Sequence, residues 1–382
     1  MGINEESLEM HEKLKGKLEI HSKIALKERK DFSLAYTPGV AEPCRKIAEN
    51  PDDVFKYTIK SHTVAVISNG TAVLGLGNIG ASAAIPVMEG KAAIFKELGG
   101  VDAFPICIDS EDISENINII RKISSVFGGI NLEDYKAPEC FEIEAGLQDL
   151  GIPVMHDDQH GTAIVVLAGM INSLKLVEKK IEDVKIVLSG AGAAGIAITK
   201  LLLDYGAKSE KVILCDSKGI IFSERGDLNK SKKEIASRTN SFNVKGNFND
   251  AIKNADVFIG VSKPGVLSKQ HIGLMNEKAI VFAMANPIPE IMPDDAIGAG
   301  AEIVATGRSD FPNQVNNALA FPGLFKGALR CRALRITEKM KLAAAKAIAG
   351  MISPKKEMIL PLITDRKVAD VVANAVEKAW KE

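Results

Sequence analysis

The sequence predicts an α/β protein of two domains, an N-terminal α/β domain with parallel strands followed by a Rossmann-type dinucleotide-binding domain. A chain of 382 residues is too long for one ordinary hydrophobic core. Between residues 103 and 135 a strand pattern, an amphipathic helix and a second strand alternate, which is typical of parallel β-α-β units. A glycine-rich turn at residues 190–195 marks the second domain. We expect the domains to span residues 1–158 and 159–382.

The composition argues against several kinds of partner. Lys and Arg (48) nearly balance Asp and Glu (49), and the net charge of -1 gives no reason to expect nucleic acid or a membrane surface as partner. No apolar run approaches the roughly 20 residues that cross a bilayer, and residues 1–17 lack the apolar segment of a secretory signal. We therefore expect a cytoplasmic protein whose five widely spaced cysteines are all reduced.

The N-terminal region contains one long helical pattern and one rigid turn. Residues 5–30 have the apolar spacing of an amphipathic helix, whose usual role is packing or a dimer contact. Pro38 and Gly39 set a turn, and Pro38 favours extended geometry at Thr37. Tyr36 therefore lies beside a fixed corner, where a tyrosine is more often a core residue than a reactive one.

A turn signal and a weak glycine motif follow. Residues 68–71, SNGT, lie between two apolar runs and predict a β-hairpin. Residues 75–80, GLGNIG, have GxGxxG spacing, but Pro86 interrupts the following helix and no acidic residue ends a strand at the expected distance. Lys91 lies among Ala, Ile and Phe residues, and a lysine desolvated in this way has a lowered pKa and can act as a base near neutral pH.

Acidic residues gather at the predicted carboxyl ends of strands, which share one edge of a parallel sheet where ligands bind. For Asp157 and Asp158 alone, the ordinary interpretation is a solvated loop that opens a helix over 162–177, with Asp158 or Thr162 as its N-cap. A second acidic pair favours a Mg²⁺ or Mn²⁺ site, because adjacent carboxylates need a cation and these ions prefer oxygen ligands. The strand-end acids are Asp109, Glu133, Asp134, Asp157 and Asp158.

The turn GAGAAG at residues 190–195 has the full context of a dinucleotide site. It follows a strand, opens a helix and precedes a second strand that ends at Asp216. Its glycines allow a tight turn, close approach of a pyrophosphate and helix–strand packing. The alternative is a glycine-rich turn in a plain α/β domain. The cofactor-binding residues expected in this segment are Gly190, Gly192, Ala193, Ala194, Gly195 and Asp216.

Asp216 bears on the choice between NAD and NADP. A carboxylate at this strand end accepts from the ribose hydroxyls and repels a 2′-phosphate, which favours NAD. Lys218 is close enough in sequence to offset that charge. The sequence therefore leaves both cofactors open.

Three further strands, within residues 255–262, 278–287 and 302–307, end in Ser, Asn or Gly residues. Asn286, Asn316 and Asn317 are uncharged donors that could hold a carboxylate without repelling metal ligands, or they are ordinary turn asparagines. The remainder of the chain, from residue 324 on, reads as helical.

Several blocks together resemble the malic enzymes, specifically the short prokaryotic form. They follow the order of that family over most of the chain, and YTPGVA and HDDQHGTA are the more specific of them. The blocks are YTPGVA (36–41), GLGNIG (75–80), MEGKAAIFK (88–96), LEDYKAPECFEIE (132–144), HDDQHGTA (156–163), GAGAAG (190–195), ANP (285–287) and NNALAFPG (316–323).

The resemblance implies oxidative decarboxylation of L-malate to pyruvate and CO₂ with NAD or NADP and Mg²⁺ or Mn²⁺, with oxaloacetate decarboxylation as a side activity. We also expect a homodimer. The resemblance further implies Glu133, Asp134 and Asp158 as metal ligands, Lys91 as general base and substrate contact, Tyr36 as general acid, Asp157 as the residue that holds Lys91, and Asn286, Asn316 and Asn317 as contacts of the malate carboxylate.

The sequence departs from the pattern of this family at one place, and two other classes of protein share some of its features. Larger members of the family carry an arginine shortly before the first glycine block, where this sequence has Ala72 and Val73. An amino-acid dehydrogenase also combines a lysine with a Rossmann domain, but it needs no metal and no acidic cluster. A nucleotide-sensing module would bind NAD without needing Lys91 and Tyr36 near a metal.

Overall fold

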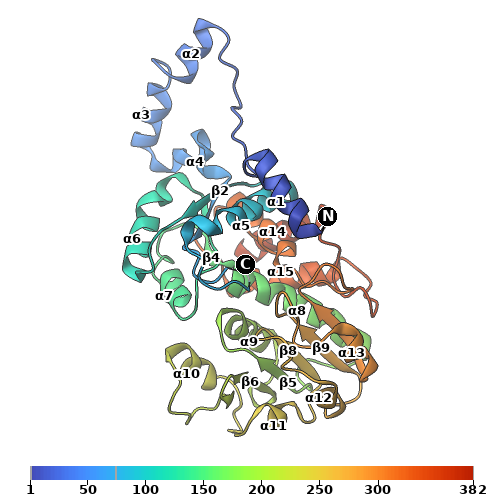
Figure 1. Cartoon of the computed structure of the whole chain (residues 1–382). Helices are drawn as coiled ribbons and strands as arrows, with labels where there is room; N and C mark the ends of the chain where they lie inside the picture. Colours follow the sequence, from blue (N-terminus) through green and yellow to red (C-terminus); the bar gives the residue numbers. More distant parts are fainter. Residues whose placement is uncertain (1, 74, 382) are drawn as a thin grey trace.

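The computed structural model describes residues 2–73 and 75–381 and contains two parallel-stranded sheets with helices around each (Figure 1). The first sheet has the order β2-β1-β3-β4, and the second has the order β10-β9-β8-β5-β6-β7, in which only β6 and β7 are antiparallel. This confirms the predicted fold of an α/β domain plus a Rossmann-type domain. The strands are β1 Thr63–Ser68, β2 Asp102–Cys107, β3 Gly129–Leu132, β4 Val154–His156, β5 Ile186–Ser189, β6 Val212–Asp216, β7 Gly219–Ile220, β8 Val257–Gly260, β9 Ala279–Ala283 and β10 Ala301–Thr306.

The helices are divided between the two sheets, the N-terminal segment and the C-terminal segment. Their bounds are α1 Ile3–Leu14, α2 Arg29–Ala35, α3 Ala41–Glu49, α4 Val54–Tyr57, α5 Ala81–Ile94, α6 Ile113–Ile123, α7 Glu139–Ala145, α8 Asp157–Val177, α9 Ala193–Tyr205, α10 Lys230–Ala236, α11 Phe248–Ile252, α12 Lys269–Gly273, α13 Pro293–Gly298, α14 Phe321–Arg330, α15 Glu338–Gly350 and α16 Lys367–Lys381.

The register of the first sheet brings two acidic pairs side by side. Leu132, the last residue of β3, pairs with Ile67 of β1 on one side and His156 of β4 on the other. The residues that follow β3 and β4 therefore leave the sheet at the same level. Asp109 follows β2, which is separated from β3 by β1, and its side chain is exposed.

Helix α8 begins at Asp157, five residues earlier than predicted. His156 is its N-cap residue, so the expectation that Asp158 or Thr162 caps this helix is wrong. Both aspartates instead lie in the first turn, where the helix macrodipole favours negative charge. By length and composition α8 could cross a membrane, but 72% of its apolar stretch is buried inside the protein. The helix packs against α9 and α15, as a core helix does.

The C-terminal helices return to the first sheet, although they follow the second sheet in sequence. Phe325 of α14 is fully buried and contacts Gly129 of β3. The rings of Phe321 and Phe325 pack against Phe95, which directly follows α5. Helix α16 packs along α14, where Val372 and Ala373 lie over glycines of α14. The core beneath the first sheet is therefore built from both ends of the chain.

Three local expectations from the sequence are wrong. The helix predicted over residues 5–30 ends at Leu14, because Lys15 and Gly16 both have positive φ, and an irregular segment follows. The turn at 68–71 does not form a hairpin, because β1 pairs in parallel with β2 and β3 instead. Pro86 lies inside α5 without ending it, since the buried face of that helix continues through Met88 and Ala92.

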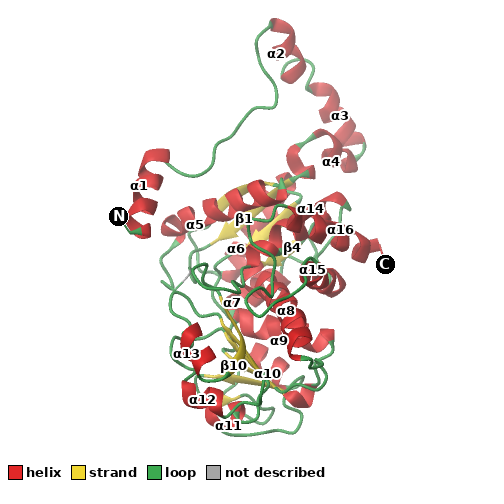
Figure 2. Cartoon of the chain, turned by 90° about the vertical axis from the view of Figure 1, so that its right-hand side faces the viewer, coloured by secondary structure: helices red, strands yellow, loops and turns green. Residues whose placement is uncertain are grey.

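Helices α2 and α3 form an arm that stands clear of the body of the protein, at the end far from the second sheet (Figures 1 and 2). Its apolar side chains face solvent: Phe32 is 53% exposed, Leu34 66% and Tyr36 73%. The interpretation of Tyr36 as a core residue is therefore wrong. None of the five cysteines is paired with another in the described chain.

Replacing Phe325 with alanine should lower the free energy of unfolding by about 3–5 kcal/mol, the usual cost of deleting a fully buried ring. Urea unfolding followed by the fluorescence of the single tryptophan, Trp380 on α16, measures the loss. Phe104→Ala is the control, because Phe104 is 47% exposed on the edge strand β2 and its loss should cost less than about 1 kcal/mol. Equal losses in both variants would contradict the placement of Phe325 in the core.

Candidate active site

Lys91 lies at the centre of a buried ion cluster at the carboxyl edge of the first sheet. It projects from α5 and is only 8% exposed. Its Nζ atom is 2.6 Å from Oδ2 of Asp157 on α8 and 2.8 Å from Oε1 of Glu133, which follows β3. The same Nζ lies 4.2 Å from the centre of the Phe321 ring, a cation–π distance. Three separate segments are thus joined by one ammonium group.

The charges in this cluster raise the pKa of Lys91, whereas its sequence context predicts a lowered pKa. Burial alone would lower the pKa of Lys91, but the charges and hydrogen bonds of Asp157 and Glu133 outweigh it and raise that pKa above the usual value. Burial raises the pKa of both Glu133 and Asp157 to about 7, against the opposing charge of Lys91. Lys91 is therefore a charged lysine with two partners, and the lowered pKa that its apolar sequence context suggested is wrong for this arrangement.

Glu133, Asp134 and Asp158 converge beside this cluster. One carboxylate oxygen from each lies within 4.8 Å of the others. The backbone N–H of Asp134, which has a φ of 55°, donates to Oδ2 of Asp158 at 2.8 Å. Asn131 donates to Oε2 of Glu133 at 2.8 Å and orients that side chain. Three hard oxygen donors around one point are suited to a divalent cation such as Mg²⁺ or Mn²⁺, so the donor set fits such an ion.

The position of Asp157 depends on Gly161 and Asn317, and the sequence indicated neither of these two contacts. A Cβ atom at Gly161 would lie 1.8 Å from Oδ1 of Asp157, so only glycine leaves room for this carboxylate one turn earlier in α8. Asn317 donates from Nδ2 to Oδ2 of Asp157. Gly161 lies inside the HDDQHGTA block, but its role follows from helix packing and not from its chemistry.

The other predicted asparagines lie in different surroundings. The side chain of Asn316 accepts from the backbone N–H of Ala318 and caps the short helix Asn317–Leu319. Asn286 is exposed on the loop after β9. Its carbonyl oxygen lies 2.9 Å from where a Cβ of Gly75 would be, so the first glycine block and this loop approach each other across the two domains.

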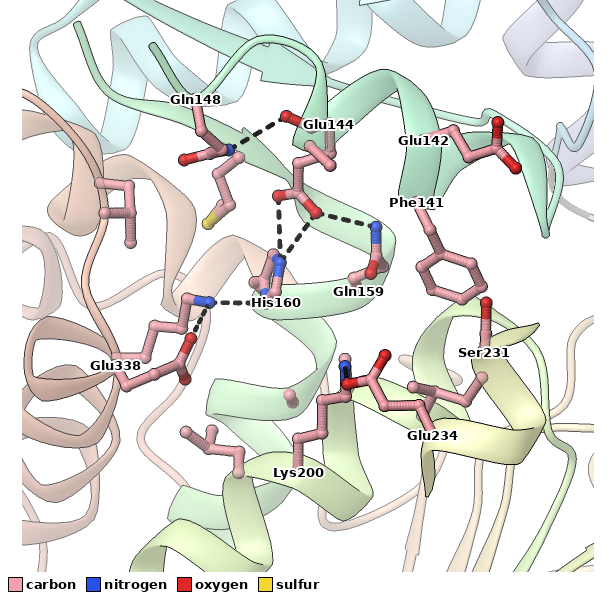
Figure 3. Close-up of a pocket in the computed structure, with 18 of the residues that line it drawn as sticks. Phe141, Glu142, Glu144, Gln148, Gln159, His160, Lys200, Ser231, Glu234 and Glu338 are labelled. Carbon is pink, nitrogen blue, oxygen red and sulfur yellow. Dashed lines mark hydrogen bonds and ion pairs between the residues drawn. The ribbon is translucent and has the colours of Figure 1, made fainter. Parts of the chain in front are cut away.

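A polar network holds the back of the first turn of α8 (Figure 3). Glu144 of α7 accepts from the backbone N–H of His156 at 3.0 Å and from Gln159 at 3.1 Å, and His160 lies 3.0 Å from it. On its other side, His160 meets Nζ of Lys341 at 2.9 Å. The network borders a cavity of about 700 Å³ between α7, α8, α9 and α10. It fixes the turn that carries Asp157 and Asp158.

The turn at residues 190–195 has the geometry that a dinucleotide site requires. Gly190 has a φ of 114°, and a Cβ there would lie 2.5 Å from the carbonyl oxygen of Val261. A Cβ at Gly195 would lie 1.8 Å from the carbonyl oxygen of Gly190, so both positions need glycine. Gly192 is the N-cap residue of α9, and Ala193 and Ala194 form its first turn. The N–H groups of this helix end are available for an anion.

Two predicted site residues, Asp216 and Tyr36, have surroundings that differ from those expected. Asp216 ends β6 as predicted, but its side chain is only 7% exposed and already bonds Arg225 and Lys232. Tyr36 directly follows α2 on the exposed arm, and the described chain does not bring it to Lys91. Phe321 and Glu144, by contrast, contact the cluster or its helix without having been predicted, because nothing in their sequence context distinguishes them from ordinary core and surface residues.

Comparisons with known proteins agree over nearly the whole chain. The family model described as "Malic enzyme, NAD binding domain" matches residues 159–380, and "Malic enzyme, N-terminal domain" matches residues 15–113. The NAD-dependent malic enzyme of Geobacillus stearothermophilus is 53% identical over 99% of this chain and 79% of its own length. The NADP-dependent malic enzyme of Halomonas elongata is 45% identical over 98% and 92%. The crystal structure of the NAD-dependent malic enzyme from Thermotoga maritima superposes with a TM-score of 0.94 at 49% identity, covering 97% of this chain and 98% of that one.

Glu144→Gln should lower the free energy of unfolding at pH 7 by about 2–4 kcal/mol, because it removes the charge that the buried donors of His156 and Gln159 and the half-buried His160 share. Burial alone would raise the pKa of Glu144, but His160 and Lys341 lower it to about 2 from its usual value of 4.5. A lowered folded-state pKa stabilises the protein above pH 4.5, and this contribution disappears as the pH falls toward 2.

The difference in the free energy of unfolding between Glu144→Gln and the native protein should therefore be constant near neutral pH and become smaller in acid. Urea unfolding at several pH values tests this. Glu142→Gln, an exposed position on the same helix, is the control and should have little effect at any pH. If Glu144→Gln lowers the free energy of unfolding only slightly at pH 7, the network does not hold α8.

Proposed function

This chain belongs to the malic enzyme family, and we propose that the buried cluster around Lys91 is the centre at which it converts L-malate to pyruvate and CO₂ with reduction of NAD(P)⁺. The observation that carries the proposal is one lysine held between Asp157 and Glu133, directly beside three converging carboxylates. Neither rival class explains this combination. An amino-acid dehydrogenase has no use for the acidic set, and a sensing module has no use for the lysine.

The metal ligands proposed are Glu133, Asp134 and Asp158. A bound Mg²⁺ or Mn²⁺ would polarise the C2 oxygen of malate, stabilise the enolate that remains after CO₂ leaves, and engage the Glu133 carboxylate. Lys91 would then keep Asp157 as its single carboxylate partner, and its pKa would move back toward the range of a useful base. Asp157 holds the ammonium group in place through this exchange.

The remaining side chains have roles in proton transfer and orientation. Once Glu133 is engaged by a cation and Lys91 is in its neutral form, Lys91 would take the proton of the C2 hydroxyl, because its Nζ lies at the centre of the described cluster. Asn286 and one or both of Asn316 and Asn317 are the proposed contacts of a malate carboxylate. The turn 190–195 at the N-terminus of α9 binds the pyrophosphate of the cofactor, which supplies the hydride acceptor.

Activity should require a divalent cation, and Asp158→Asn should weaken Mn²⁺ binding by more than about tenfold because it removes a charged ligand. Titration of Mn²⁺ followed by the resonance of the free ion measures this, and malate turnover should vanish on chelation and return with Mn²⁺. Asp109→Asn is the control, since Asp109 is an exposed acid at another strand end. Full turnover after exhaustive chelation would contradict the metal assignment.

Tyr36 is proposed as the acid that protonates C3, supplied by a second copy of the chain in a homodimer. The arm of α2 and α3 exposes Phe32, Leu34 and Tyr36 far from the body that would hold the reaction (Figure 2). Such exposed apolar side chains indicate an interface. An isologous dimer places two arms on two bodies at once, and each centre then receives a tyrosine from its partner.

Mixing two inactive variants tests this arrangement. Tyr36→Phe and Lys91→Met should each lose most malate turnover, but mixed dimers contain one centre with both residues intact. After mixing and re-association, about a quarter of the native activity should return, since random pairing gives half mixed dimers with one working centre each.

The control is a mixture of Lys91→Met and Asp158→Asn, whose residues lie in the same body and so should not complement in this dimer. Tyr36→Phe should also reduce supplied oxaloacetate far better than it turns over malate, since that step needs no proton at C3. Absence of recovery in the first mixture would overturn the shared centre. Oxaloacetate decarboxylation as a side activity and a cytoplasmic location remain predictions.

A further inference from the structure

We propose that Glu290 is a positioning residue of the malate site, which joins the loops that follow β8 and β9 and so fixes the place of Asn286. The inference rests on the proposed function, in which Asn286 contacts a malate carboxylate. Glu290 lies on the loop after β9, and its side chain is fully buried. It therefore acts through the chain around it and touches no ligand.

The two carboxylate oxygens of Glu290 hold backbone groups of two different loops. Oε1 accepts from the N–H of Ser262 at 2.9 Å, in the loop after β8, and Oε2 accepts from the N–H of Ala285 at 3.0 Å, in the loop after β9. The backbone oxygen of Glu290 accepts from the N–H of Leu267 at 3.2 Å and so holds the β8 loop a second time. One side chain thus satisfies a buried or half-buried donor from each loop and joins the two.

The end of β8 has room for this carboxyl group because residue 260 is a glycine. A Cβ atom at Gly260, the last residue of β8, would lie 2.3 Å from Cδ and 2.6 Å from Oε1 of Glu290. Since Oε1 is held by Ser262, it cannot move aside without losing that hydrogen bond. The strand end is therefore shaped around the carboxyl group, which occupies one defined place.

Both chain neighbours of Asn286 are anchored. The N–H of Ala285 donates to Glu290, and the carbonyl oxygen of Pro287 accepts from NH1 of Arg308 at 3.0 Å. Asn286 itself is exposed, so the direction of its amide is set by the backbone on either side of it. Groups that bind a substrate must be held within about 0.5 Å of the productive geometry. Releasing one of the two anchors would let the loop shift and would weaken the contact.

A change from carboxylate to amide at this position breaks the link between the loops with little change in volume. Glutamate offers an acceptor oxygen to each loop, whereas glutamine has one acceptor oxygen and an NH₂ group that donates. In Glu290→Gln the NH₂ group would face the N–H of either Ser262 or Ala285, so the two loops would no longer be joined. The N–H that loses its acceptor would favour a shifted backbone in which it finds another partner.

Malate kinetics in a double-mutant cycle separate positioning from general destabilisation. Glu290→Gln should raise the KM for malate by at least about tenfold and reduce kcat by less, because a contact to the bound substrate is weakened. Asn286→Ala should raise the KM by a similar factor. Adding Glu290→Gln to Asn286→Ala should then raise the KM by less than about twofold more, because the residue through which Glu290 acts is gone.

The affinity for Mn²⁺ reports whether each variant is folded. It should stay within about twofold of the native value, because the proposed metal ligands lie at the edge of the first sheet, away from the altered loops. Asp294→Asn is the matched control for the change from carboxylate to amide. Asp294 is an exposed acid in the first turn of α13, and its variant should keep the native KM.

A native KM in Glu290→Gln would overturn the inference, and so would effects of Glu290→Gln and Asn286→Ala that multiply in the double variant. If Glu290→Gln loses Mn²⁺ binding, Gly260→Ala replaces it, since the added methyl group displaces the same carboxyl group and should give the same KM and the same coupling to Asn286. Loss of Mn²⁺ binding in both variants would show that Glu290 serves the fold alone and would also overturn the inference. These outcomes leave the proposed function standing, whereas absence of malate turnover in the native protein would overturn that function and this inference with it.

Discussion

The ion cluster of Lys91, Asp157 and Glu133 is the interaction on which the rest of the structure depends. An ammonium group with 8% exposure is tolerable only because two carboxylates lie within 2.8 Å of it, and removing either partner would leave an uncompensated charge in a poorly solvated place. The three residues come from α5, α8 and the end of β3. Their mutual attraction therefore fixes two helices against one sheet, and the same contacts assemble the centre at which we propose that the reaction takes place.

Helix α8 connects this ion cluster to the core of the protein. Its first turn carries Asp157 and Asp158 at the front, and at its back His160 of the same helix contacts Glu144 of α7 and Lys341 of α15. Its middle residues are buried in the core that both sheets share. Gly161 shows how tight the packing is, because any side chain there would occupy the place of the Asp157 carboxylate. A substitution that removes the contacts behind the helix is therefore expected to alter the positions of Asp157 and Asp158.

Two features of the site extend beyond a single compact domain. Phe321 and Asn317, which touch Lys91 and Asp157, come from the segment that follows the second sheet. The arm with Tyr36 leaves the body altogether and exposes apolar side chains to solvent. A centre assembled from distant segments, and in our proposal from two chains, buries the cluster more fully than one segment could.

The two-domain α/β architecture could be predicted from the sequence alone, as could the approach of Glu133 and Asp134 to Asp157 and Asp158. Alternation of strands and helices is a local pattern, and the requirement for glycine at Gly190 and Gly195 is set by the backbone near those residues. The acidic pairs could be predicted to meet because parallel strands end at one edge. The sequence also named the family, through blocks that span most of the chain.

How those residues act on one another could not be predicted from the sequence and follows from their contacts in the folded chain. The pKa of Lys91 rises and does not fall, because Glu133 and Asp157, which are 42 and 66 positions away in the sequence, come close in space and their charges outweigh burial. Asp216 is neutralised because a loop and a helix fold back to it, and Tyr36 is exposed because no part of the chain within residues 2–73 and 75–381 covers it. Charge compensation and burial depend on distances in space. These distances are set by the packing of segments that lie far apart in the sequence, and a local sequence pattern does not show which segments will pack together.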